Sequence, residues 1–200
     1  MAEKIIMATQ NKGKLAEINE LVKEFGIEIQ SMADAGLDGL DIKEDGKTCV
    51  ENSFIKANTV VQITGIPAIA DDAGLFVEAL GGAPGIYSAR YAGIHGDDAA
   101  NRKKLLQELA KINAFTKEER KAYFTCVITL VYPDGQKIVC EGFCHGSISL
   151  SEQGDQGFGY DSVFIPDGYE CTFAQMGVEQ KNKFSHRAKA LAELKEKLKK

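Results

Sequence analysis

Ala68-Ile-Ala-Asp-Asp-Ala-Gly74 is the stretch around which the rest of the chain is organised. An apolar run leads into two adjacent carboxylates, Asp71 and Asp72, and a second apolar run, Leu75-Phe76-Val77, follows them. Carboxylates between two apolar segments are costly to remove from water unless a cation meets them. The plain alternative is a turn, in which Asp-Asp-Ala-Gly joins two strands. The local sequence favours neither interpretation, so the flanking segments have to decide.

The composition fits one globular domain, residues 1–200, with room for two lobes. Hydrophobic residues make up 44% of the chain and charged residues 26%, which is ordinary for a globular protein. The net charge of −5 gives no reason to expect a nucleic-acid polymer, although one basic pocket can still bind a small anion. No apolar run approaches the ~20 residues that span a bilayer. The five cysteines lack paired spacing and follow no secretory signal, so we expect reduced thiols and a cytoplasmic protein.

The chain before the central stretch opens as strand, turn, helix and strand. We expect strands at Lys4–Thr9 and Ile27–Gln30, and between them a helix from Asn11 to Phe25 that Gly26 ends. The turn Thr9-Gln10-Asn11-Lys12-Gly13-Lys14 places a hydroxyl, an amide and two ammonium groups at a helix start, where N–H groups favour anions. This turn could bind a phosphate group, although it lacks the spacing of a Walker A motif. The plain alternative is a helix cap at Asn11 followed by solvated lysines.

The next segments add acidic and basic side chains. A polar loop, Met32–Lys47, carries Glu44 near its end. We expect Thr48 to cap the following helix, with Glu51 completing a capping box, and this helix carries Lys56. A glycine-rich loop and a helix opened by two aspartates lie beyond the central stretch.

The second half of the chain predicts a hairpin and a final helix. We expect strands at Ala122–Tyr132 and Lys137–Cys144 around a Pro-Asp-Gly turn, a third strand at Ser147–Ser151, and a short strand at Ser162–Pro166. The last helix begins at Ser185.

Three groups of polar residues together describe a metal–nucleotide pocket: the basic turn near the N-terminus, the carboxylates of the central region, and an aromatic and basic set near the C-terminus. Carboxylates without paired His or Cys prefer a hard ion, so Mg²⁺ is the expected cofactor. The residues of the third group are Phe158, Tyr160, Asp161, Lys181, His186 and Arg187.

Six motifs follow one another along the chain: Thr9-x-Asn11-x-x-Lys14, Glu51-Asn52, Ala70-Asp71-Asp72-x-Gly74-Leu75, the stretch from Gly81 to Tyr91, Phe158-Gly159-Tyr160-Asp161 and Ser185-His186-Arg187. In this order they resemble the Ham1/inosine triphosphate pyrophosphatase family. The resemblance implies an α/β fold of two lobes on a long mixed sheet with flanking helices, and an active-site cleft between the lobes. It also implies a homodimeric house-cleaning hydrolase that converts the purine nucleoside triphosphates ITP, dITP and XTP to the monophosphate and pyrophosphate with Mg²⁺.

The resemblance also implies a role for each matching residue. Asp72 would be the general base, and Glu44 and Asp72 would hold the metal. Phe158 would stack on the purine, and Lys181, His186 and Arg187 would read its edge. The remaining substrate-binding residues would be Thr9, Gln10, Asn11, Lys12, Gly13 and Lys14 at the triphosphate, Lys56 near it, Ala73, and Gly159, Tyr160 and Asp161 at the base.

The side-chain chemistry supports the choice of base independently. Lys and Arg only donate hydrogen bonds, and His can donate, so they suit the 6-keto acceptor of a deaminated purine and not the amino donor of adenine. The sequence departs from the family at three positions: Gln10 stands where glycine is usual, Ala73 where serine is common, and Ser162 where proline is usual. The alternatives are a Maf-like nucleotide pyrophosphatase with another base preference, a non-catalytic nucleotide-binding module, and a plain α/β scaffold.

Overall fold

Strands and helices alternate through most of the chain. The structure is a computed structural model that describes residues 4–22 and 27–199, so the predicted helix end at Phe25 and Gly26 lies outside the described residues. The alternation confirms the expected α/β class. The strands and α-helices are β1 (Lys4–Met7), α1 (Lys12–Val22), β2 (Glu28–Ser31), α2 (Cys49–Thr64), β3 (Ala68–Val77), β4 (Pro84–Gly85), α3 (Asp98–Lys111), β5 (Lys121–Val131), β6 (Lys137–Ile148), β7 (Phe164–Pro166), α4 (Phe173–Met176), α5 (Val178–Lys181) and α6 (His186–Leu198).

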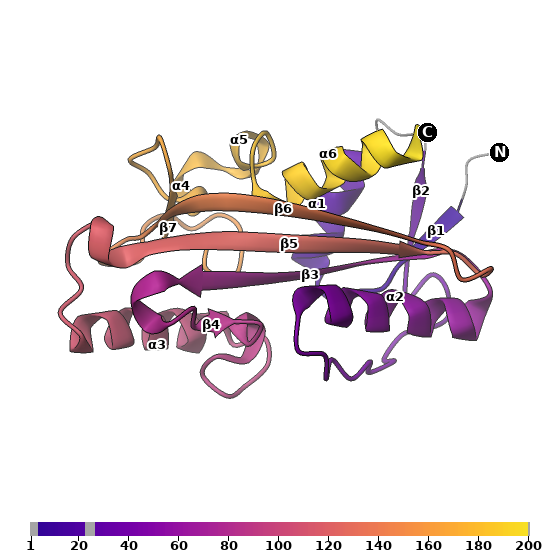
Figure 1. Cartoon of the computed structure of the whole chain (residues 1–200), viewed down its shortest axis with the longest axis horizontal. Helices are drawn as coiled ribbons and strands as arrows, with labels where there is room; N and C mark the ends of the chain where they lie inside the picture. Colours follow the sequence, from indigo (N-terminus) through magenta and orange to yellow (C-terminus); the bar gives the residue numbers. More distant parts are fainter. Residues whose placement is uncertain (1–3, 23–26, 200) are drawn as a thin grey trace. The chain divides into compact units, whose positions relative to one another are not determined.

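The strands form one mixed sheet, as expected. In the described residues it has seven strands, which run in the hydrogen-bonded order β2-β1-β3-β5-β6-β7, with β4 paired to β3 (Figure 1). β1 is parallel to β2 and to β3, whereas the pairs β3–β4 and β6–β7 are antiparallel. The parallel pairs follow from helical crossovers, because α1 connects β1 to β2 and α2 leads into β3.

β3 runs unbroken through Asp71, Asp72 and Gly74, so the turn interpretation of this stretch is wrong. Instead, the missing side chain of Gly74 allows the backbones of β3 and β4 to approach each other closely. A Cβ atom on Gly74 would lie 2.6 Å from the carbonyl oxygen of Gly85, where β4 passes beside β3. The two carboxylates therefore belong to the buried interior of a strand.

β6 is also longer than predicted. It continues to Ile148, and the separate strand expected at Ser147–Ser151 is absent from the described residues. The two expected strands lay on either side of Gly146, but this residue belongs to β6 and lies opposite Pro166 in the β6–β7 pair. A Cβ atom there would overlap the carbonyl oxygen of Ile165 and lie 2.9 Å from Cα of Pro166.

The described residues cluster into two compact units, and each has its own apolar core. Unit 1 comprises Met1–Asp72, Cys126–Gly142 and Arg187–Lys200, and unit 2 comprises Ala73–Thr125 and Phe143–His186. In unit 1, residues of β1, α2 and β3 pack together, among them Ile6, Val60 and Ala70. In unit 2, residues such as Leu105 of α3, Phe124 of β5 and Phe164 of β7 do the same.

The ends of α2 largely follow the sequence signals. The Thr48 side chain accepts the N–H of Glu51 at 3.1 Å, and Gly65 ends the helix with a φ of 67°. The Glu51 carboxylate, however, accepts the N–H of Lys47 at 2.6 Å and does not close the predicted capping box on Thr48. Among the helices in residues 4–22 and 27–199, none combines the length and apolarity needed to cross a membrane.

We predict that Gly146→Ala lowers the free energy of unfolding by about 3 kcal/mol, because the new methyl group meets the β7 backbone. Gly135→Ala is the control. Gly135 has a φ of 86° and open space around it, so its cost is the backbone strain alone, about 1 kcal/mol. Urea unfolding measures both variants, and equal losses would contradict the close β6–β7 approach.

Candidate active site

Asp71 is fully buried and ion-paired in unit 1. Arg187 donates to its Oδ2 atom from Nη2 at 2.8 Å and from Nε at 3.2 Å, and Lys14 Nζ lies 3.3 Å from the same oxygen. Burial by itself raises the pKa of Asp71, but the charges of Lys14, Arg187 and Lys56 outweigh burial and hold that pKa well below its ordinary value. Asp71 is therefore an ionised carboxylate.

The same ion pair connects three elements of the fold. Arg187, at the start of α6, also donates from Nη1 to Glu17 of α1, and Glu17 is only 4% exposed. Glu17 lies one helical turn after Lys14, so α1 presents one positive and one negative side chain to this cluster. The Oδ1 atom of Asp71 is buried without a hydrogen-bond partner among the described residues, and Cys126 Sγ lies 4.0 Å from Oδ2.

Asp72 contacts a different set of residues, which belong to α2. Asn52 Nδ2 donates to its Oδ2 atom at 3.3 Å, and Lys56 Nζ lies 3.7 Å from its Oδ1 atom. Burial is the largest influence on the pKa of Asp72 and raises it above the ordinary value, although Lys56 and Lys14 act in the opposite direction. Burial and the adjacent Asp72 also raise the pKa of the Cys49 thiol to about 12, which keeps that thiol protonated.

Glu44 and Asp72 share one ammonium group. Lys56 Nζ lies 3.1 Å from Glu44 Oε2 as well as 3.7 Å from Asp72, so two negative charges face one positive charge. The donor set fits a hard divalent cation, because carboxylate oxygens are its preferred ligands. Within the described part of the chain, no group of three His, Cys, Asp or Glu residues is arranged to hold a metal ion. A cation here would therefore complete its shell with water or substrate oxygens.

The basic turn before α1 is preorganised by its own side chains. Thr9 Oγ1 accepts the N–H of Asn11 at 3.2 Å, and Asn11 Oδ1 accepts those of Gly13 at 2.9 Å and Lys14 at 3.1 Å. The helix-cap interpretation of Asn11 is thus confirmed, and phosphate binding stays a prediction. The Gln10 amide, at one position that departs from the family, donates to the carbonyl of Leu40 at 2.8 Å.

Part of the aromatic and basic group gathers in unit 2 around Asp161. The Oδ2 atom of Asp161 accepts Lys181 Nζ at 2.7 Å and the N–H of Phe158 at 3.0 Å. Lys181 Nζ also lies 4.9 Å from the centroid of the Phe158 ring. His186 stacks on Phe124, with ring centroids 4.6 Å apart, and Tyr160 donates its hydroxyl to the carbonyl of Ser88 at 2.9 Å.

The structure thus gathers several of the predicted site residues into one cluster in each unit. The first contains Lys14, Glu44, Lys56, Asp72 and Arg187 together with Asp71, and the second contains Phe158, Asp161 and Lys181, whereas the described partner of His186 is Phe124. Ala73 is a half-buried residue of β3. Arg187 was predicted to read the base, and that role stays a prediction, because its described partners are Asp71 and Glu17.

Sequence reasoning missed three contacts of the first cluster. Asn52, which donates to Asp72, was named only as part of the Glu51-Asn52 motif and was given no role. Glu17 and Cys49 gave no signal, because a single acid on an amphipathic helix and a lone cysteine are ordinary in sequence.

The sheet and these clusters define an α/β protein with buried, closely paired charges. The model of the Ham1 family matches residues 5–197, and the chain belongs to this family. It is 49% identical over 200 residues to a dITP/XTP pyrophosphatase of Haemophilus influenzae, covering 99% of this chain and 100% of the relative. A dITP/XTP pyrophosphatase of Desulfotalea psychrophila is 50% identical over 195 residues, covering 98% and 85%.

Solved structures agree with this assignment. A HAM1 protein from Coxiella burnetii superposes with a TM-score of 0.87 at 38% identity, covering 98% of each chain. The Ham1 protein of Staphylococcus aureus gives a TM-score of 0.84 at 36% identity with the same coverage. The matched family is the one that the sequence motifs indicated.

We predict that Arg187→Met lowers the free energy of unfolding by about 3–5 kcal/mol, because it leaves Asp71 and Glu17 buried without their shared cation. Lys189→Met changes an exposed residue of the same helix and is expected to stay within about 0.5 kcal/mol of wild type. Urea unfolding followed by circular dichroism measures both. Similar values for the two variants would contradict the ion-pair network.

Proposed function

We propose that this protein hydrolyses dITP, ITP and XTP to the nucleoside monophosphate and pyrophosphate, with Mg²⁺ as its cofactor. The observation that carries the proposal is 49% identity with a dITP/XTP pyrophosphatase over the whole length of that relative. Such an enzyme removes deaminated purines from the nucleotide pool. We further propose that it acts as a cytoplasmic homodimer of one two-lobed domain, with the substrate in a cleft between the lobes.

Asp72 is the proposed general base. It is 8% exposed and its described partners are an amide, an ammonium group and the Cys49 thiol, whereas Asp71 has no exposed surface and its Oδ2 atom is bound by Arg187 and Lys14. A base has to reach the water whose proton it accepts, which favours the accessible carboxylate. Asp72 takes a proton from water as the water oxygen attacks the α-phosphorus, and pyrophosphate leaves.

The phosphates are the proposed ligands of the Thr9–Lys14 turn and of Lys56. Thr9 and Asn11 already orient the N–H groups at the start of α1, which lowers the cost of ordering this turn around an anion. The ammonium groups of Lys12, Lys14 and Lys56 offset the charge of the triphosphate. When bound at Glu44 and Asp72, Mg²⁺ supplies further positive charge beside the phosphate oxygens.

The purine is the proposed ligand of the cluster around Asp161. The face of Phe158 stacks on the base, and Asp161 holds the ammonium group of Lys181, which only donates hydrogen bonds and so suits a 6-keto oxygen. The 6-amino group of adenine is itself a hydrogen-bond donor, so it would face other donors and leave them without an acceptor. Each group left unpaired costs ~1–3 kcal/mol. One or two such clashes reduce the use of ATP by roughly 10- to 10⁴-fold.

The catalytic proposal predicts that wild type releases pyrophosphate from ITP, dITP and XTP with Mg²⁺, and that Asp72→Asn lowers kcat by about 10²- to 10⁴-fold. Substrate profiling with GTP, ATP, dTTP and UTP in the same assay distinguishes this enzyme from a Maf-like pyrophosphatase. An inactive wild type, or a variant with the full rate, would show that the assignment is wrong.

The metal proposal predicts that a chelator abolishes pyrophosphate release and that added Mg²⁺ restores it. Glu44→Gln is expected to raise the Mg²⁺ concentration for half-maximal rate by about 10-fold or more, because a neutral amide is a weaker ligand. Asp45→Asn is the matched control, since Asp45 is the neighbouring acid and pairs with Lys43 at an exposed site. Equal Mg²⁺ requirements of the two variants would exclude Glu44 as a ligand.

A further inference from the structure

Helix α3 holds both backbone polar groups of Gly159, a residue of the proposed purine-binding segment. Asp98 Oδ2 accepts the N–H of Gly159 at 2.8 Å, and Arg102 Nη1 donates to its carbonyl at 2.8 Å. Asp98 and Arg102 are four residues apart, so they lie on the same face of α3. One helix face therefore fixes the two peptide units that flank the Cα atom of Gly159.

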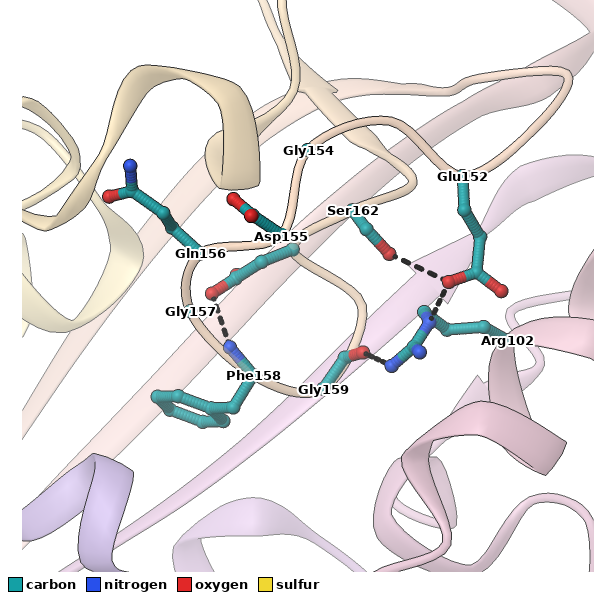
Figure 2. A pocket seen from close by; sticks show the side chains of 10 residues that line it. Arg102, Glu152, Gly154, Asp155, Gln156, Gly157, Phe158, Gly159 and Ser162 are labelled. Atoms are coloured by element: carbon teal, nitrogen blue, oxygen red, sulfur yellow. Dashed lines mark hydrogen bonds and ion pairs between the residues drawn. The ribbon is translucent and has the colours of Figure 1, made fainter.

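Arg102 also anchors a second point of the same segment, as Figure 2 shows. Its Nε atom donates to Glu152 Oε2 at 2.7 Å, and Ser162 Oγ donates to the same carboxylate oxygen at 3.2 Å. Ser162 is the residue that stands in place of the usual proline. The guanidinium thus connects Gly159 to Glu152, and Glu152 connects to Ser162, so that residues 152–162 are held around α3.

The clamped residue lies between the groups that are proposed to meet the base. Gly159 has a φ of 60°, a left-handed conformation that side chains disfavour, and it directly follows Phe158. The N–H of Phe158 and the ammonium of Lys181 both bind Asp161, two residues further on. A shift of the Gly159 peptide would therefore move the stacking ring relative to the ammonium group.

We propose that Asp98 and Arg102 are positioning residues for purine recognition, which fix the Phe158–Asp161 turn from α3 without touching the base. This inference rests on the proposed function for the identity of the ligand. If Asp98 and Arg102 had only a structural role, substituting them would affect folding and the binding of all ligands alike. If they position the turn, substituting them weakens the binding only of ligands that carry a base.

The test uses direct binding of the two reaction products by titration calorimetry, because IMP carries the purine and pyrophosphate does not. We expect Arg102→Ala to weaken IMP binding by about 10-fold, because the turn loses its charged hydrogen bonds. The affinity for pyrophosphate is expected to stay within about 2-fold of wild type. Asp98→Ala is expected to act in the same direction. Asp98→Asn retains an oxygen acceptor for the Gly159 N–H and is expected to recover most of the affinity.

Lys103→Ala is the matched control, because Lys103 is the exposed neighbour of Arg102 on α3. If IMP and pyrophosphate binding weaken equally in Arg102→Ala, or if neither changes relative to Lys103→Ala, the positioning role is wrong. Should Arg102→Ala unfold, Arg102→Lys replaces it, since lysine keeps the charge but lacks the forked donors that reach Gly159 and Glu152 together.

Hydrogen–deuterium exchange separates this inference from the proposed activity. The amides of residues 158–161 are expected to exchange faster in Arg102→Ala than in Lys103→Ala, whether or not the enzyme turns over ITP. Unchanged exchange would overturn the clamp even in an active enzyme. A wild type that binds IMP but releases no pyrophosphate from ITP would instead refute the proposed catalysis and leave the positioning of the purine intact.

Discussion

Successive residues of a β-strand face opposite sides of a sheet, and β3 uses this alternation to separate the carboxylates of Asp71 and Asp72. Asp71 meets side chains of α1 and α6, whereas Asp72 meets side chains of α2. In Figure 1, α2 and α6 lie on different sides of the strands of unit 1. Two buried negative charges on adjacent residues can coexist because each is ion-paired with a cation from a different helix, Asp71 with Lys14 and Arg187 and Asp72 with Lys56.

The separation gives the two carboxylates different properties. Asp71, with Arg187 and Lys14 on one oxygen, joins secondary-structure elements that are distant in sequence. Asp72 keeps some exposed surface and shares Lys56 with Glu44. The two carboxylates therefore carry one more negative charge than the ammonium group of Lys56 neutralises. The proposed chemistry uses this second carboxylate, and the first one holds the strand and helices in place.

Much of the fold could be predicted because its signals are local. The Thr48 cap and a pair of aspartates located the starts of α2 and α3, and the Pro-Asp-Gly turn located the β5–β6 hairpin. Two differences in the strands involve glycines. The turn alternative included Gly74 and the two expected strands lay on either side of Gly146, but each glycine allows a neighbouring backbone to approach, and the sequence does not say which strand lies beside a glycine. Whether such a glycine ends a strand or permits a close approach depends on the strand that lies beside it.

The candidate site was predictable only where several residues formed an ordered motif. The roles of Asp98 and Arg102 could not be found in this way, because they depend on which loop lies against α3. The role of Glu17 could not be found in this way either. This buried acid on α1 is explained by its ion pair with Arg187, which lies near the other end of the chain.

The most direct test of the account is the ionisation of the two adjacent carboxyl groups in the metal-free protein. Carbon-13 NMR of the Asp71 and Asp72 carboxyl carbons during an acid titration measures both pKa values. The account predicts that Asp71 stays ionised well below the ordinary range, because Lys14 and Arg187 outweigh its burial, and that Asp72 protonates above its ordinary value because of burial. If Asp72 stayed ionised to lower pH than Asp71, the division of the pair into a structural and an accessible carboxylate would be contradicted.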